Sequence, residues 1–150
     1  MRQSSRFADE RGSSSLEFIT VGMVMLIPLV YLVLTMSAIQ SGALAAEGAA
    51  RQAARVFVQA DTLSEANAAA SRAVEFALDN HNVDAASAAV TISCAPDPSD
   101  CLSRHSFVTV QVAIAVPLPL APPVLSGSFP LEVPLDAAAT QQVSQFAGSR

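Results

Sequence analysis

Residues 18–39 read FITVGMVMLIPLVYLVLTMSAI, a run of 22 residues without a charged side chain. As an α-helix this apolar run is about 33 Å long, because each residue adds about 1.5 Å. The hydrocarbon core of a bilayer is about 30 Å thick, so the run is long enough to cross it. Pro28 lies in its middle and predicts a kink, which a membrane helix tolerates better than a water-soluble helix. This stretch decides the fold, since it predicts a membrane-crossing helix near the N-terminus.

The composition of the whole chain agrees with contact to a membrane or to a polymer of subunits. The 150 residues are 51% hydrophobic and only 14% charged, against about 25% charged in an average soluble domain. All 8 basic residues are Arg, and the formal net charge is −5. No basic cluster is dense enough to follow a phosphate backbone, which argues against a nucleic-acid partner.

The charges around the apolar run predict its direction in the membrane. Three Arg residues precede the run within residues 1–12, and the two that follow it most closely are Arg51 and Arg55. Basic residues favour the cytoplasmic side. We therefore expect residues 1–12 to be a cytoplasmic leader, residues 18–39 to be the transmembrane helix and residues 40–150 to be an exported domain.

The residues just before the apolar run carry the most specific signal. Residues 11–18 read RGSSSLEF, in which Gly12 follows the charged leader and Glu17 stands at the mouth of the apolar helix. A lone carboxylate drawn into the membrane boundary is costly. Cleavage after Gly12 would create an ammonium group on Ser13, one helical turn from Glu17. The two charges could then neutralise each other, within one chain or between neighbours.

This pattern resembles the N-terminus of type IV prepilins, and among them the TadE-like minor pilins (pseudopilins) of the tight-adherence, or Flp, pilus system. The matching positions are Arg11, Gly12, Glu17 and Phe18, followed by the apolar run. The resemblance implies cleavage between Gly12 and Ser13 by a prepilin peptidase, so that residues 13–17 form a processing and assembly segment. It also implies assembly with other pilin subunits through the N-terminal helix, with Glu17 and Phe18 as the assembly residues.

Two other interpretations of the apolar run stay open at this stage. A plain single-span anchor would hold an extracellular binding domain in the membrane and would never be processed. A secretory signal peptide could be cut after Ala45, because residues 43–45 supply a small-x-small site, and would release a soluble domain. Against the signal peptide, the run exceeds the about 7–15 apolar residues usual in such signals, and it contains Pro28.

The Ala-rich stretch from Ser37 to Ala60 predicts that the membrane helix continues outward. Ala is the strongest helix former, and Glu47 and Arg51 are spaced to form an i, i+4 ion pair. Small side chains allow close helix packing. They suit either a bundle of helices in a filament or packing on the protein's own domain.

A second, amphipathic helix is expected from Leu63 to about Asp79. Thr62 and Glu65 form the capping-box pattern at its start, and small and apolar residues recur in it at spacings of three and four. The sequence around Asn80–Asn82 is suited to end it, because Asn tolerates the left-handed conformation.

Beyond this helix the apolar residues recur at every second position, which predicts strands. Residues 90–94 and 107–116 are expected to form an antiparallel hairpin with a long polar loop. A third strand is expected over residues 131–140, at a sheet edge because it contains proline. Residues 117–130 are too rich in proline for regular structure and predict an extended connection. The expected fold is therefore α+β: a long N-terminal helix, a second helix and a small antiparallel sheet of about three strands.

The only two cysteines, Cys94 and Cys101, flank the predicted hairpin loop. Outside the cell membrane they would be oxidised, and their spacing indicates a local disulfide. The alternative is a zinc site with His105 and the distant His81, but the spacing C-x6-C-x3-H matches no common zinc motif. A Cys–His nucleophile pair is less favoured still, because no orienting acid or oxyanion donor can be assigned to it.

No sequence motif for enzymatic chemistry accompanies these features. The chain contains no Gly-rich phosphate loop, no HExxH and no paired-carboxylate motif. Residues 13–15 are interpreted as a polar linker and His105 as a loop residue. We therefore expect a non-enzymatic membrane protein without cofactor or metal, placed in the cell membrane and in or at the base of a pilus. Its expected partners are the lipid bilayer, a prepilin peptidase, other pilin subunits and the assembly machinery.

Overall fold

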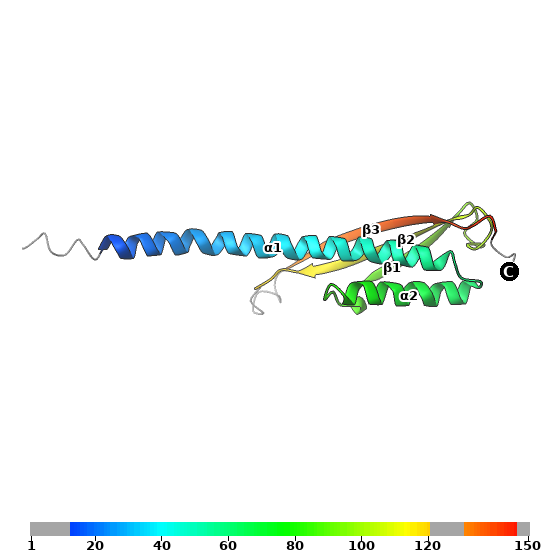
Figure 1. The fold of residues 1–150 in the computed structure, drawn as a ribbon, viewed down its shortest axis with the longest axis horizontal. Helices are drawn as coiled ribbons and strands as arrows, with labels where there is room; N and C mark the ends of the chain where they lie inside the picture. The colour runs from blue at the N-terminus through cyan, green and yellow to red at the C-terminus, as the bar shows by residue number, and fades with distance from the viewer. Residues whose placement is uncertain (1–12, 121–130, 147–150) are drawn as a thin grey trace, which may run out of the picture. The chain divides into compact units, whose positions relative to one another are not determined.

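A computed structural model describes residues 13–120 and 131–146 of the chain (Figure 1). In chain order the elements are helix α1 (Ser13–Phe57), helix α2 (Leu63–Asp79), the short 3-10 helix η1 (Ala85–Ser87) and strands β1 (Ala89–Ala95), β2 (Phe107–Pro117) and β3 (Glu132–Gln142). The strands form one antiparallel sheet in the order β1-β2-β3. This α+β layout confirms the predicted fold class. The chain divides into a first unit, Met1–Met36, and a second unit, Ser37–Arg150, which we call the folded unit.

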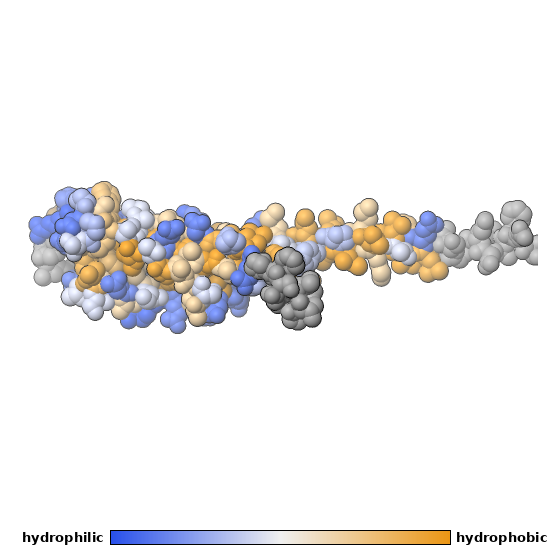
Figure 2. Space-filling view, turned by 180° about the vertical axis from the view of Figure 1, so that it is seen from behind, coloured by the Kyte–Doolittle hydropathy of each residue, from blue (hydrophilic) through white to orange (hydrophobic). Residues whose placement is uncertain are grey.

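The described part of the first unit is the apolar half of α1. The helix runs through Pro28, and the large apolar side chains of this half are exposed, Phe18 by 81% and Met25 by 72%. The hydroxyl groups of Thr20 and Thr35 donate to the carbonyls four residues earlier, so their polar atoms are satisfied within the helix. Figure 2 shows this part of the chain as an almost continuous hydrophobic surface. By length and composition the helix can cross a membrane.

The core of the folded unit lies between the two helices and one face of the sheet. Strand β2 is central, and its alternate residues from Val108 to Val116 are buried. Six alanines of α1 are almost fully buried as well: Ala45, Ala46, Ala49, Ala50, Ala53 and Ala54. The sequence left two interpretations of the Ala-rich stretch open: packing against other helices in a filament, or packing on the protein's own domain. These six side chains pack on the protein's own domain.

Both ends of α2 agree with the sequence signals. The Thr62 side chain accepts a hydrogen bond from the Glu65 backbone N–H at 3.2 Å, as a capping residue should. The helix ends at Asp79, and Asn82 takes the left-handed conformation with φ 56°. The chain then turns so that the Val83 N–H donates to the Leu78 carbonyl at 3.0 Å.

Strand β3 is an edge strand, as its proline predicted, and it extends to Gln142, two residues beyond the predicted end. The Leu118 N–H donates to the Leu131 carbonyl at 2.9 Å. Because hydrogen-bonded pairs alternate along an antiparallel ladder, the ring nitrogen of Pro134 faces away from β2, where no hydrogen is needed. The predicted connection over residues 117–130 lies mostly outside the described residues.

Gly42 permits a close approach between α1 and the sheet. A Cβ atom at this position would collide with Val116 and would lie 3.2 Å from Leu135 Cδ1. Gly48, further along the same helix, has no such neighbour within 4 Å of the equivalent position. The two glycines therefore differ in packing although both lie within one helix.

We predict that Gly42→Ala destabilises the folded unit and that Gly48→Ala, the matched control, stabilises it. Overpacking at Gly42 costs about 1–3 kcal/mol and outweighs the gain in helix propensity, whereas Gly48→Ala keeps that gain of up to about 1 kcal/mol. The measurement is urea unfolding of the full chain in detergent, followed by circular dichroism. Equal shifts of the two midpoints would contradict the packing described for Gly42.

Candidate functional site

The predicted processing and assembly residues lie at the start of α1. Gly12 is outside the described residues, and α1 is described from Ser13 onward. Because residues 13–17 are helical, Ser13 and Glu17 are four residues apart on one helical face. Glu17 and Phe18 are both exposed. The backbones of Ser13 and Glu17 are therefore about one helical turn apart.

Glu17 has an unusual environment for a carboxylate. The next charged residue along α1 is Glu47. No Asp, Glu, Lys, Arg or His lies between Glu17 and Glu47. The Glu17 side chain makes no hydrogen bond or ion pair with any other residue in the described part of the chain. Glu47, in contrast, pairs with Arg51 as the spacing predicted. Glu17 is therefore a charge that borders an apolar surface without a described partner.

Cys94 and Cys101 form the disulfide that their spacing predicted, with their Cα atoms 5.2 Å apart. The zinc alternative is wrong for this structure, because the two sulfur atoms are bonded to each other and cannot serve as thiolate ligands. His81 lies before the start of β1, whereas Cys94 lies near its end. The length of the strand therefore separates His81 from Cys94 along the chain. Within residues 13–120 and 131–146 no group of three or more His, Cys, Asp or Glu residues could hold a metal ion.

The loop closed by the disulfide is held by local hydrogen bonds. Asp97 Oδ1 accepts from the Ser99 hydroxyl at 2.7 Å and from the Ser99 backbone N–H at 2.8 Å. Both hydrogen bonds hold the pKa of the Asp97 carboxyl below its ordinary value of 3.8, and the bond from the Ser99 hydroxyl has the larger effect. His105 is a loop residue, as predicted, and takes a positive φ of 64°.

Ser106 anchors the same loop to the sheet. Its side chain is buried, and its hydroxyl lies 2.7 Å from the Ser103 carbonyl and 2.9 Å from that of Cys101. The Ser106 carbonyl accepts from the Val143 N–H at 2.8 Å. The loop is therefore a fixed surface feature, tied both to β2 and to the residue that follows β3.

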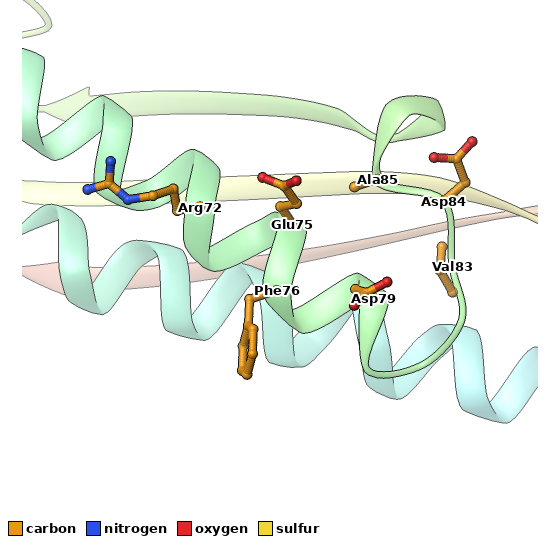
Figure 3. Close-up of a pocket in the computed structure, with 7 residues that line it drawn as sticks. All are labelled: Arg72, Glu75, Phe76, Asp79, Val83, Asp84 and Ala85. Atoms are coloured by element: carbon orange, nitrogen blue, oxygen red, sulfur yellow. The ribbon is translucent and has the colours of Figure 1, made fainter.

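A surface depression of about 520 Å³ lies between α2 and the turn that leads into η1 (Figure 3). Its lining side chains include one guanidinium and three carboxylates, and the Phe76 ring points away from the carboxylate of Glu75. The lining residues are Arg72, Glu75, Phe76, Asp79, Val83, Asp84 and Ala85. Sequence reasoning did not single out this depression, since it depends on the turn after α2. Its lining contains no Ser, Thr, Cys, Lys or His side chain.

The structure also brings together Ser41 and His81, a pair that the sequence did not suggest. The Ser41 Oγ atom lies 3.4 Å from His81 Nδ1. This distance is long for a hydrogen bond, and no carboxylate in the described part of the chain is hydrogen-bonded to His81. The pair shows that α2 ends at the level of Ser41, but it lacks the third group that orients a catalytic histidine.

Neither a family model, nor a curated protein, nor a solved structure matches this chain.

We predict that the double substitution Cys94→Ser and Cys101→Ser lowers the free energy of unfolding by about 2–3 kcal/mol. The reason is that the disulfide closes a short loop and restricts the unfolded chain. The measurement is urea unfolding of the double variant and of the unreduced full chain in the same detergent. Reduction of the wild-type chain is the control and should give the same loss, whereas an unchanged midpoint in both would contradict this role.

Proposed function

We propose that this protein is a non-enzymatic, membrane-anchored subunit of pilus assembly that resembles the TadE-like minor pilins. The single observation that carries the proposal is the position of Glu17. This carboxylate stands five residues after Gly12, at the start of an apolar helix whose large side chains are exposed. A prepilin-like role accounts for the small residue, the acid and the apolar helix together.

The exposed apolar half of α1 requires an apolar environment. Its large side chains are 39–81% exposed, from Tyr31 to Phe18, and a continuous apolar surface of this kind marks a site of membrane or protein contact. The lipid bilayer satisfies this requirement before assembly. Within a filament, neighbouring helices of the same kind would supply the apolar environment instead. Pilus assembly would need this exchange of lipid contacts for helix contacts.

Glu17 provides the specificity of that exchange. After cleavage, the ammonium group of Ser13 would lie one helical turn from Glu17 in the same chain, or could reach Glu17 of a neighbour. In a medium of low dielectric constant an unpaired charge is costly, so a subunit with an unpaired Glu17 would gain strongly from a correctly placed amine. An unprocessed chain has no amine at this position.

The buried residues of α1 favour a retained helix over the secreted alternative. Cleavage after Ala45 would remove the buried residues Gly42 and Ala45 from the folded unit, together with the partly buried Ala38 that packs against its core. A secreted domain would begin in the middle of its own packing surface. Retention of α1 keeps this surface complete.

The direct test of processing is the intact mass and N-terminal residue of the protein isolated from its native membranes. We predict a chain that begins at Ser13, because the resemblance implies cleavage after Gly12. A chain that retains residues 1–12 would leave a plain anchor, and a chain that begins at Ala46 would identify a secreted domain. Either of these two results would overturn the proposal.

We further predict that Glu17→Gln abolishes assembly while membrane insertion and abundance are unchanged. The amide keeps the size of the side chain but cannot neutralise the Ser13 amine. The matched control is Glu47→Gln, which removes a carboxylate from the same helix at an exposed ion pair and should assemble as the wild type does. The measurement is the fraction of subunit recovered in sheared pili or cross-linked oligomers. Normal assembly of Glu17→Gln would rule out the amine–carboxylate mechanism.

A further inference from the structure

Strands β1 and β3 form the two edges of the sheet, and the two edges differ in composition. Native proteins commonly block an edge with proline or with charged side chains. Strand β3 contains both, because Pro134 directs its ring nitrogen outward and Glu132 and Asp136 are exposed. Strand β1 reads AVTISCA, without proline or charge, and each of its residues is at least partly exposed. The edge of β1 therefore lacks the features that prevent another strand from pairing with it.

The hydrogen-bond ladder identifies which backbone groups of β1 point out of the sheet. The Leu118 N–H donates to the Leu131 carbonyl, and the Val143 N–H donates to the Ser106 carbonyl. Both bonds fit the register of β2 with β3. Because hydrogen-bonded pairs recur at every second residue, the even-numbered residues of β2 bond to β3 and the odd-numbered residues bond to β1.

In β1 the N–H and C=O groups of Val90, Ile92 and Cys94 therefore point away from β2. Their partners in the register are even-numbered residues of β2, which bond to β3 instead. Within residues 13–120 and 131–146 no hydrogen bond to another element occupies these groups. Each of the three residues thus offers one donor and one acceptor, alternately spaced as an extended strand requires.

The sequence AVTISCA is nearly symmetric about Ile92, with hydroxyl residues on both sides of it and alanine at both ends. Antiparallel pairing of two copies about Ile92 would place Val90 opposite Cys94 and Thr91 opposite Ser93 of the second copy. The outward groups of Val90, Ile92 and Cys94 would then meet as hydrogen-bonded pairs. Thr91 and Ser93 would meet in the alternate pairs, in which the side chains lie closer together.

The sheet already contains a hydroxyl pair of this kind. Thr109 on β2 lies opposite Thr140 on β3, and their hydroxyl oxygens are 2.8 Å apart. Ser93 is the partner of Thr109 on β1 and is exposed, as is Thr91. A pair of Ser93 with Thr91 of a second copy would continue this row of hydroxyl groups across the contact. Such cross-strand hydroxyl pairs stabilise sheets.

We propose that β1 is an interaction surface for a second copy of this chain. The two β1 strands pair antiparallel about Ile92, so that two three-stranded sheets become one continuous sheet. The contact is isologous, because both copies use the same strand. It involves the folded unit alone and rests neither on membrane anchoring nor on pilus assembly.

Charge substitutions at Thr91 and Ser93 test both the contact and its register. Thr91→Lys with Ser93→Lys places like charges opposite each other and should raise the dissociation constant of the dimer several-fold. Thr91→Lys with Ser93→Glu places opposite charges there and should restore the wild-type constant. The matched control is Ala138→Lys with Gln142→Lys, at exposed positions of β3, which should leave the constant unchanged. The measurement is sedimentation equilibrium of the full chain in detergent at low salt.

Equal weakening by the double-lysine and the lysine–glutamate variants of β1 would overturn the proposed register. Equal weakening by the β3 control would overturn the contact itself, since the effect would then come from added charge alone. Circular dichroism of each variant checks that the folded unit is intact.

Amide hydrogen exchange of the wild-type full chain identifies what occupies the edge and needs no variant. We expect the N–H groups of Val90, Ile92 and Cys94 to become protected as the protein concentration rises through the dissociation constant. Protection that does not depend on concentration would show that a segment of the same chain covers the edge. Rapid exchange at every concentration would show that the edge stays open. Either of these two results would overturn the inference.

Discussion

In the folded unit the alanine face of α1 lies against the valine face of β2, and the other elements depend on this contact. Small alanine side chains allow the helix backbone to approach the sheet closely, and the buried alanines of α1 and the buried β-branched residues of β2 belong to one core cluster. Gly42 extends the close approach to the end of the strand, where Val116 and Leu135 lie. Larger side chains on this face of α1 would separate the two layers and expose the inner face of the sheet.

The same helix meets two environments because its side chains change in size along its length. Before Ser37 the apolar residues are large, mainly Leu, Val, Met and Ile, and they are exposed. After it they are mainly Ala, and one face is buried in the folded unit. Large apolar side chains gain most from contact with lipid or with neighbouring helices, whereas small ones suit close contact with a sheet. A single helix can therefore act as an anchor and as part of a core without a linker between the two roles.

Local signals in the sequence were sufficient for most of the fold. The Thr62 cap and the alternation in β2 are decided by neighbouring residues, and the disulfide joins residues only seven positions apart. The partner of the Ala-rich face could not be predicted, because small residues suit a neighbouring subunit as well as a sheet of the same chain. The contact between Ser41 and His81 joins residues forty positions apart. It depends on how far α2 extends along α1, which no local pattern encodes.

The two carboxylates of α1 show how environment decides what a charge contributes. Glu47 pairs with Arg51 on an exposed face, where such a pair stabilises a helix by only about 0.3–0.5 kcal/mol because water screens it. Glu17 has the same chemistry but borders an apolar surface and has no partner in the described part of the chain. There the cost of the lone charge is larger, and so is the gain from a correctly placed amine. The ion pair at Glu47 can be lost at little cost, whereas the proposed function would require a partner for Glu17.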